Sequence, residues 1–253
     1  MELRQRVAIV TGSASGIGAA TAIALARRGC NVVINYTRNE ADAEETAAAC
    51  TSLGVEAMLC RADVSSDDDC RRMVAAAAER WGRLDVLVNS AGTTKFVPHS
   101  NLDGLDAEDF QRIYAVNTIG PFQMARAAAP HMRSAGAGAI VNVSSGAGIY
   151  GRGSSIAYGA SKGALNNLTL ALARVLAPEI RVNAVCPTLV DTRWMRTLMG
   201  EDYEKRIAAT RAKVPLHKVC SPEDVAETIL WLVAGAGTMT GELILMDGGQ
   251  HLL

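Results

Sequence analysis

Three side chains in the sequence could together move a proton. Tyr158 and Lys162 lie four residues apart in Tyr158-Gly-Ala-Ser-Lys162, and Ser145 lies thirteen residues before the tyrosine. In a helix, residues at i and i+4 share a face, so the ammonium would lie near the phenol. A neighbouring positive charge lowers the pKa of a tyrosine from about 10 by favouring the phenolate. The pair therefore suits general acid/base chemistry, although a surface tyrosine packed on a lysine stem is the simpler alternative.

A glycine-rich turn near the N-terminus could bind a phosphate. The apolar run Val7–Val10 leads into Thr11-Gly-Ser-Ala-Ser-Gly-Ile-Gly18, and an alanine-rich segment follows. Glycines permit a tight turn, and the free N–H groups at the start of the next helix face an anion. The spacing GxxxGxG excludes a Walker loop, and a turn without a ligand stays an alternative. The residues of the predicted dinucleotide site are Gly12, Ser15, Gly16, Ile17 and Gly18.

The end of the second expected strand indicates which dinucleotide binds. In α/β folds that bind dinucleotides, an acid at the end of the second strand hydrogen-bonds the 2′-hydroxyl of NAD, whereas a basic group there accommodates the 2′-phosphate of NADP. The sequence reads Asn35-Tyr36-Thr37-Arg38, with no acid and an arginine just beyond the strand. We therefore predict that Arg38 favours NADP, and NAD is the alternative if Arg38 is an ordinary loop residue.

Short β-branched runs alternate with longer alanine- and leucine-rich segments along nearly the whole chain. This pattern predicts a parallel sheet with helices on both faces. The expected strands are Val7–Val10, Asn31–Asn35, Val55–Cys60, Asp85–Val88, Ala139–Val143, Arg181–Cys186 and Leu243–Met246. The expected helices lie near 17–28, 39–52, 66–80, 106–133, 157–176, 201–212 and 222–233. No linker or repeat divides the series, so the predicted fold is a single-domain α/β Rossmann fold over residues 1–253, with a seven-stranded parallel sheet.

Composition and charge exclude several classes of function. With 49% hydrophobic and 20% charged residues the chain is globular rather than disordered. A net charge of -1 leaves no basic excess for binding nucleic acid or an anionic membrane. Residues 7–26 carry no charge, but polar residues interrupt them, and Val7–Val10 is too short for a signal peptide. We expect a cytoplasmic protein without nucleic-acid or membrane partners.

Cysteines and histidines show no ligand spacing. The six cysteines never form CxxC, and none has a partner histidine at a zinc-like distance. A reduced chain without disulfides or metal explains them most simply.

Together these motifs resemble the short-chain dehydrogenase/reductase family, 3-oxoacyl-acyl-carrier-protein reductases included, over essentially the whole chain. Two positions depart from the family pattern, because Ser90 stands where a second Asn is usual and Thr188 replaces the Gly after Pro187. The matching residues are Thr11-Gly12-xxx-Gly16-Ile17-Gly18, Asp63-Val64, Asn89-Ser90-Ala91-Gly92, Asn117, Ser145, Tyr158, Lys162, Pro187 through Thr192 and Asp247-Gly248-Gly249.

The resemblance implies interconversion of a carbonyl group and a secondary alcohol by hydride transfer to or from a nicotinamide. Tyr158 would exchange a proton with the carbonyl oxygen, and Ser145 would hydrogen-bond that oxygen. Lys162 would hold the nicotinamide ribose and lower the pKa of Tyr158. Asn117 would anchor a water in a proton relay through Lys162.

The resemblance also implies contacts with the rest of the cofactor. After the third strand, the residues that would contact adenine are Asp63 and Val64. After the fourth strand, the cofactor channel would be lined by Asn89, Ala91 and Gly92. After the sixth strand, the nicotinamide would be surrounded by Pro187, Val190 and Thr192. The alternatives are structural, since Asp63 could end a strand and Asn89 could satisfy backbone groups.

The expected substrate lid is the segment at about 188–214. No helix or strand is predicted for the stretch at about 187–200, where the lid begins. Its side chains suit a partly hydrophobic carbonyl compound such as a 3-oxoacyl thioester, a sugar or polyol, or a cyclic ketone. Packing of the lid onto the core explains the same side chains. By analogy, the helix after Tyr158 and the segment Leu243–Leu253 would take part in a homotetramer.

Two other functions remain alternatives. A non-catalytic NAD(P)-binding regulatory protein would keep this fold without turnover, but it need not retain the set Asn117, Ser145, Tyr158 and Lys162. A methyltransferase on a related sheet would need no YxxxK pair, and it typically has an acid where this chain has Tyr36.

Overall fold

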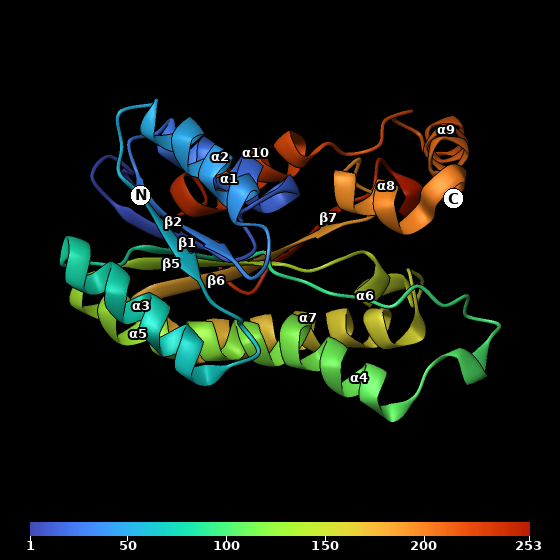
Figure 1. The fold of residues 1–253 in the computed structure, drawn as a ribbon, viewed down its shortest axis with the longest axis horizontal. Coiled ribbons are helices and arrows are strands. Elements are labelled where there is room, and N and C mark those ends of the chain that lie inside the picture. The colour runs from blue at the N-terminus through green and yellow to red at the C-terminus, as the bar shows by residue number, and fades with distance from the viewer.

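A central sheet of seven parallel strands runs through the molecule (Figure 1), and the computed structural model describes all residues, 1–253. The strand order is β3-β2-β1-β4-β5-β6-β7, and every neighbouring pair is parallel. The strands are β1 (Val7–Val10), β2 (Asn31–Tyr36), β3 (Ala57–Arg61), β4 (Val86–Asn89), β5 (Gly138–Val143), β6 (Ile180–Pro187) and β7 (Leu243–Met246). The predicted single-domain Rossmann fold is confirmed, and the predicted strands agree with these bounds to within two residues.

Helices cover both faces of the sheet (Figure 1). One layer contains α1 (Gly16–Ala26), α2 (Glu40–Thr51) and α10 (Pro222–Ala234), and the other contains α3 (Asp67–Trp81), α4 (Ala107–Tyr114), α5 (Gly120–Ser134) and α7 (Ile156–Leu176).

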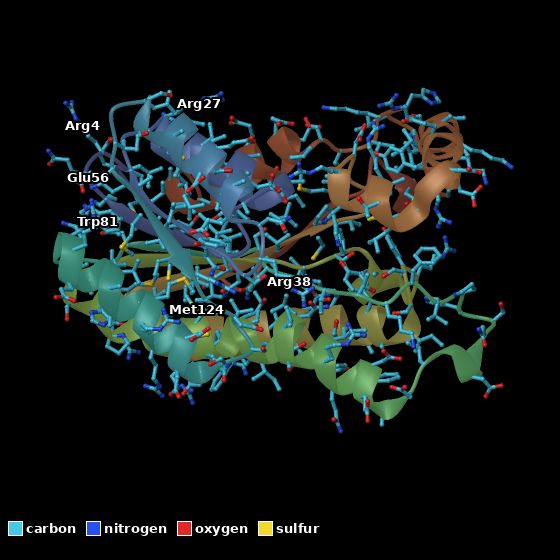
Figure 2. The ribbon with its side chains drawn as sticks, in the orientation of Figure 1. Arg4, Arg27, Arg38, Glu56, Trp81 and Met124 are labelled. Atoms are coloured by element: carbon cyan, nitrogen blue, oxygen red, sulfur yellow. The ribbon has the colours of Figure 1, made fainter.

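Side chains alternate across the sheet, which gives each helical layer its own core. Along β1, Ala8 and Val10 join the core under α1 and α10. Val7 and Ile9 join the core under α3 and α5, where Met124 of α5 is fully buried (Figure 2). Because both faces are apolar, the polar site must lie beyond the strand ends.

The helix predicted over 106–133 is observed as an unbroken helical stretch, but it is not one regular α-helix. A π-helical turn, η2 (Ala115–Ile119), separates α4 from α5. Such a turn takes up one residue more than an α-helical turn, so a 3.6-residue pattern does not reveal it. It carries Asn117, which is fully buried.

The lid, residues 188–214, contains two helices. α8 (Arg193–Met199) occupies the part for which the sequence predicts no element, and the Thr192 hydroxyl caps it by accepting from the Met195 N–H at 3.2 Å. The 3-10 turn η3 (Gly200–Asp202) leads into α9 (Tyr203–Lys213). Tyr203 and Ile207 pack with Val219 in a small cluster separate from the two main cores. The lid therefore has an apolar centre of its own.

Four further elements complete the chain. These are the short helix α6 (Ala147–Tyr150) and the 3-10 turns η1 (Leu102–Gly104) and η4 (Gln250–Leu252), together with an isolated bridge between Val190 and Cys220. None of the helices is long and apolar enough to span a membrane. All six cysteines are free, and no group of three or more His, Cys, Asp or Glu is placed to hold a metal.

Candidate functional site

A large cavity opens at the carboxyl ends of the strands, between the lid and the start of α7. Its volume is about 1130 Å³. In open α/β sheets this is the edge at which ligands bind. The predicted site residues that line it are Gly12, Ser15, Gly16, Ile17, Gly18, Arg38, Asp63, Val64, Ala91, Gly92, Ser145, Tyr158, Lys162, Pro187, Val190 and Thr192. Asn89 and Asn117 do not line the cavity.

The glycine turn has the backbone that a phosphate site requires. Gly12 has φ +63°, and a Cβ there would lie 2.8 Å from the Cα of Ala91. Gly16 has φ +57°, and its nearest side-chain neighbour would be Thr192 at 3.7 Å, so a side chain at Gly16 would stand in the cavity. The first turn of α1 has no acid and no side-chain cap from Ser15, which leaves its N–H groups available to an anion. These residues fit the pyrophosphate of a dinucleotide.

Two polar side chains to which the sequence analysis assigned no role hold this turn in place. The Oδ1 of Asn35 accepts from the Gly12 N–H at 3.0 Å, and its Nδ2 donates to the carbonyls of Cys60 and Ala62. Thr11 Oγ1 accepts from the backbone N–H groups of residues 90 and 91, at 3.0 and 3.1 Å. Asn35 is 1% exposed, and a polar residue inside a buried strand is the signal that could have identified it.

The adenosine end of the cavity carries the residues predicted there. The Tyr36 hydroxyl donates to Glu40 at 2.6 Å, so this acid is bound to the tyrosine. Arg38 is exposed, lines the cavity and forms no ion pair (Figure 2). The Oδ1 of Asp63 accepts from the N–H and the hydroxyl of Ser65. Asp63 is thus a turn residue two positions after β3, and it also lines the cavity.

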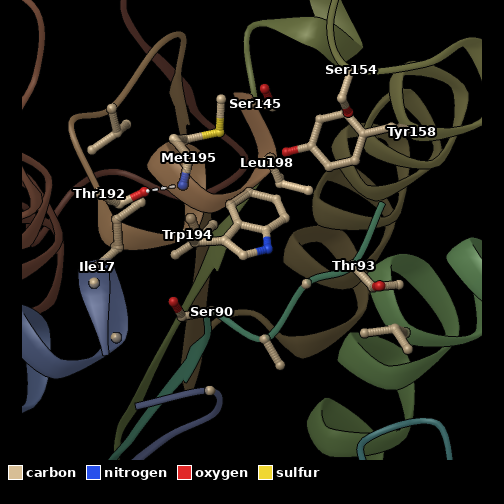
Figure 3. A pocket seen from close by; sticks show the side chains of 18 of the residues that line it. Ile17, Ser90, Thr93, Ser145, Ser154, Tyr158, Thr192, Trp194, Met195 and Leu198 are labelled. Atoms are coloured by element: carbon tan, nitrogen blue, oxygen red, sulfur yellow. Dashed lines mark hydrogen bonds between the residues drawn. The ribbon is translucent and has the colours of Figure 1, made fainter. Parts of the chain in front are cut away.

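Ser145, Tyr158 and Lys162 line the same cavity. Figure 3 shows Ser145 and Tyr158 close together on one wall. α7 begins just before the tyrosine because the Ser155 hydroxyl accepts from the Tyr158 N–H and caps the helix. The Lys162 ammonium donates to the Val143 carbonyl at 2.8 Å and lies 5.8 Å from the centre of the Tyr158 ring. The Ser145 hydroxyl accepts from the Ala147 N–H and donates to the Pro187 carbonyl at 3.3 Å. Two proton donors and a cation therefore face one space.

Burial dominates the proton affinities of this wall. It lowers the pKa of Lys162 from its ordinary 10.5 to about 8. Burial also raises the pKa of Tyr158, and the Ser145 hydroxyl opposes that rise only in part. The lowering of the Tyr158 pKa that the sequence predicts from Lys162 is not found, because burial of the phenol is the dominant influence on that pKa. Tyr158 is thus a protonated acid near neutral pH, which suits donation to a carbonyl oxygen.

The two predicted residues outside the cavity lie directly behind it. The Nδ2 of Asn117 donates to the Thr93 carbonyl at 2.9 Å and to the Ser161 hydroxyl at 3.0 Å, while its Oδ1 accepts from the Thr93 N–H. Asn89 donates to Asn142 at 2.9 Å, and its own Oδ1 is buried without a partner. The structural alternative for Asn89 agrees with this bond between neighbouring strands.

The loop after β6 accommodates its unusual threonine. Thr188 has no positive φ, so its backbone needs no glycine. Its methyl group packs against Gly146, where a Cβ would come within 2.6 Å. The absence of a side chain at Gly146 thus leaves room for Thr188. Thr192 keeps its hydroxyl proton for a ligand, since it accepts from Met195.

The lid supplies the apolar side of the cavity. Trp194, Met195, Leu198 and Met199 line it, and Figure 3 shows Trp194 and Leu198 near Tyr158. Tyr203 is turned away, since it is 2% exposed and donates to the carboxylate of Asp191. The segment thus divides between side chains that face the cavity and side chains that hold the lid together.

Known proteins resemble this chain in sequence over nearly its whole length. A family model described as enoyl-(acyl carrier protein) reductase matches residues 12–251. A protein of Streptomyces violaceoruber named as ketoacyl reductase 2 of the granaticin polyketide synthase is 46% identical, with 98% of this chain and 96% of that protein covered. The cis-4-hydroxycyclohexanecarboxylate dehydrogenase of Sinomonas cyclohexanicum is 40% identical, with 97% and 96% covered.

The solved structures agree. A structure from Burkholderia xenovorans assigned to the short-chain dehydrogenases/reductases superposes with a TM-score of 0.92 at 43% identity, and each chain is covered to 98%. The sequence match extends through the glycine turn, the Ser145, Tyr158 and Lys162 wall and the lid. The protein therefore belongs to the short-chain dehydrogenase/reductase family and is an NAD(P)-dependent oxidoreductase.

Proposed function

We propose that the protein interconverts a ketone and a secondary alcohol, with Tyr158 as the acid/base. The observation that carries this proposal is the wall formed by Ser145, Tyr158 and Lys162, which shares one cavity with the glycine turn. A nicotinamide bound along the turn would supply the hydride, and the protein would supply the proton.

In the reducing direction the Tyr158 hydroxyl donates its proton to the carbonyl oxygen as the C–H bond forms. Ser145 rotates its hydroxyl from the Pro187 carbonyl to the same oxygen, where negative charge develops. The Lys162 ammonium, which is buried, stabilises the phenolate that remains on Tyr158. Asn117 anchors a relay that returns a proton through Lys162. Oxidation of the alcohol follows the same steps in reverse.

NADP is the proposed cofactor. Arg38 supports this choice, because it lines the cavity beside the end of β2 and has no carboxylate partner. Of the acids near that strand end, Glu40 accepts from the Tyr36 hydroxyl. Asp63, after the neighbouring strand β3, accepts from the N–H and the hydroxyl of Ser65. A 2′-phosphate would therefore meet a free guanidinium there rather than a free carboxylate.

A ketone with an apolar body is the proposed substrate. The lid presents Trp194, Met195, Leu198 and Met199 to the cavity, and Phe96 lines it as well. The relatives named for ketoacyl groups and for a hydroxycyclohexanecarboxylate, at 46% and 40% identity, support a 3-oxoacyl compound or a cyclic ketone. A relative named as a glucose dehydrogenase is less similar, at 35% identity. The chain works in the cytoplasm as a homotetramer, and exposed apolar residues on α7, such as Leu170 and Val175, support such an assembly.

Replacement of Tyr158 by Phe tests the proposed reaction. The substitution should leave NADPH binding within about threefold and reduce turnover of ketones by about 10³-fold or more. The measurement is NADPH oxidation at 340 nm over a panel of 3-oxoacyl thioesters, cyclic ketones and polyols. Turnover retained by the variant would refute the role of Tyr158. Tight NADPH binding by the wild type without any turnover would instead support a regulatory function.

A further inference from the structure

The charged residues that line the cavity are strongly unbalanced. Only one of them, Asp63, is acidic, although the whole chain has a net charge of -1. Asp63 lies after β3, at the adenosine end. The substrate end, between Tyr158 and the lid, has no carboxylate in its lining. The basic residues that line the cavity are Arg38, Arg112, Arg152, Lys162, Arg193 and Arg206.

Most of these cations already have a partner or a place along the cofactor. Arg112 donates to Asp109 at 2.8 Å, and Arg193 donates to Asp42 on α2 at 2.5 Å. Lys162 donates to the Val143 carbonyl, and Arg38 lies at the adenosine end. Arg152 and Arg206 differ from these residues. Both are exposed, and neither guanidinium forms an ion pair or a hydrogen bond within the chain.

Arg152 and Arg206 belong to opposite walls of the substrate end. Arg152 lies between α6 and α7, directly before Gly153, where a Cβ would lie 3.4 Å from the Tyr158 ring. Arg206 lies on α9, and Thr210 one turn later lines the cavity as well. In Figure 1 the helices α6 and α9 stand on either side of this end of the molecule. One guanidinium therefore belongs to the catalytic wall and the other to the lid.

We propose that Arg152 and Arg206 form an anion subsite, which binds a carboxylate or phosphate group that the ketone carries away from its reacting carbon. The proposal rests on the proposed function, because it takes the ketone to be held at Tyr158. Guanidinium groups bind both anions through paired, charge-assisted hydrogen bonds. The apolar side chains of Trp194 and Leu198 contact the carbon skeleton between the two ends of the substrate. The subsite orients the ketone without forming or breaking a covalent bond.

Calorimetry on the complex with NADP⁺ tests the subsite directly, because a ketone cannot react when the cofactor carries no hydride. The carboxylate probe is 4-oxocyclohexanecarboxylate, paired with its neutral methyl ester. The phosphate probe is acetoacetyl-coenzyme A, paired with acetoacetyl-N-acetylcysteamine. At least one anionic member should bind about tenfold or more tightly than its neutral partner, and the preference should shrink at high salt. The pair that shows the preference identifies the anion.

Arg152→Gln and Arg206→Gln should each weaken binding of the preferred anionic probe about tenfold, and each should change binding of its neutral partner less than about twofold. Lys205→Gln is the matched control, because it removes the same charge from the neighbouring, exposed position of α9, which does not line the cavity. Unfolding midpoints of all three variants should equal that of the wild type, since the substituted side chains are exposed.

Three results would overturn the subsite. These are equal binding of charged and neutral probes by the wild type, equal losses for both in the arginine variants, or no binding of either anion at millimolar concentration. Turnover of the neutral methyl ester with NADPH tests the proposed reaction separately. Reduction of the ester without a charge preference keeps the reaction and removes the subsite. A charge preference without reduction of any ketone keeps the subsite and removes the reaction.

Discussion

The amide oxygen of Asn117 and the ammonium of Lys162 both approach Gly92. A Cβ at Gly92 would lie 3.5 Å from the Asn117 Oδ1 and 3.9 Å from the Lys162 Nζ. Gly92 lines the cavity, whereas Asn117 is fully buried behind it. The two polar groups that the proposed relay joins thus both border a position without a side chain.

Replacement of Gly92 by Ala should interrupt the relay without disturbing the fold. Both contacts of the added methyl group are ordinary van der Waals distances, so the free energy of unfolding should change by less than about 1 kcal/mol. The methyl group would exclude a water between Asn117 and Lys162, and kcat for ketone reduction should fall about tenfold or more. Gly237→Ala is the control, since a Cβ there meets nothing within 4 Å. An unchanged kcat in Gly92→Ala would remove the relay from the mechanism.

Replacement of Arg38 by Gln should lower the preference for NADP. The variant loses the one unpaired guanidinium at the adenosine end of the cavity, so Kd for NADPH should rise about tenfold while Kd for NADH stays within about twofold. Fluorescence titration with both cofactors measures the two constants. Arg61→Gln is the matched control, because Arg61 is exposed at the end of β3 and does not line the cavity. A wild type that binds NADH more tightly than NADPH would contradict the assignment.

Ketone reduction should fall as the pH rises through about 8. Burial lowers the pKa of Lys162 to about 8, so the ammonium that stabilises the phenolate disappears above this pH. The pKa of Tyr158 is raised, so the tyrosine keeps its proton over the same range. No histidine lines the cavity to titrate in its place. A profile of kcat/KM that stays flat from pH 6 to 10 would show that the Lys162 charge does not assist the reaction.

The same shift has a consequence for stability. A lysine whose pKa is lowered in the folded state destabilises that state while it is charged, and the penalty disappears as pH rises from about 8 to 10.5. The free energy of unfolding of the wild type should therefore rise relative to that of Lys162→Met as the pH rises over this range. Denaturant unfolding at pH 7.5 and at pH 10 measures the difference. The exposed substitution Lys205→Met should show no such dependence on pH.

Replacement of Asn35 by Ala should loosen the glycine turn. The Asn35 side chain joins the Gly12 N–H to the carbonyls of Cys60 and Ala62, and its loss leaves these groups buried without partners. The free energy of unfolding should fall by about 2 kcal/mol or more. Kd for NADPH should also rise about tenfold, because the backbone at Gly12 is no longer fixed. A loss of stability with unchanged cofactor affinity would assign Asn35 a purely structural role.

The proposed tetramer can be tested by light scattering. The wild type should have a mass four times the 26.6 kDa of one chain. Leu170→Glu, which places a charge on the exposed apolar part of α7, should reduce this mass by disrupting a subunit contact. Circular dichroism verifies that the variant keeps its fold. A monomeric wild type would refute the assembly.

Local patterns predicted all seven strands and most of the helices correctly. The apolar runs of seven strands, the glycine turn and the spacing of Tyr158 and Lys162 are all short-range signals, and each leads to the observed element. Other features depend on contacts between distant residues. The π-helical turn around Asn117 and helix α8 interrupt or lack a regular apolar period, so pattern alone missed both.

The sequence by itself determined the fold class, the motif residues and the chemistry that these residue types can perform. Tertiary structure decided which of them share one cavity, because the strand order brings loops from distant positions to one edge of the sheet. It also placed Asn117 and Asn89 outside the lining of that cavity. The Tyr203 side chain is buried within the lid, and Arg152 and Arg206 have no partners. The pKa values of Tyr158 and Lys162 belong to the structure for the same reason, since burial acts only once the chain has packed around them.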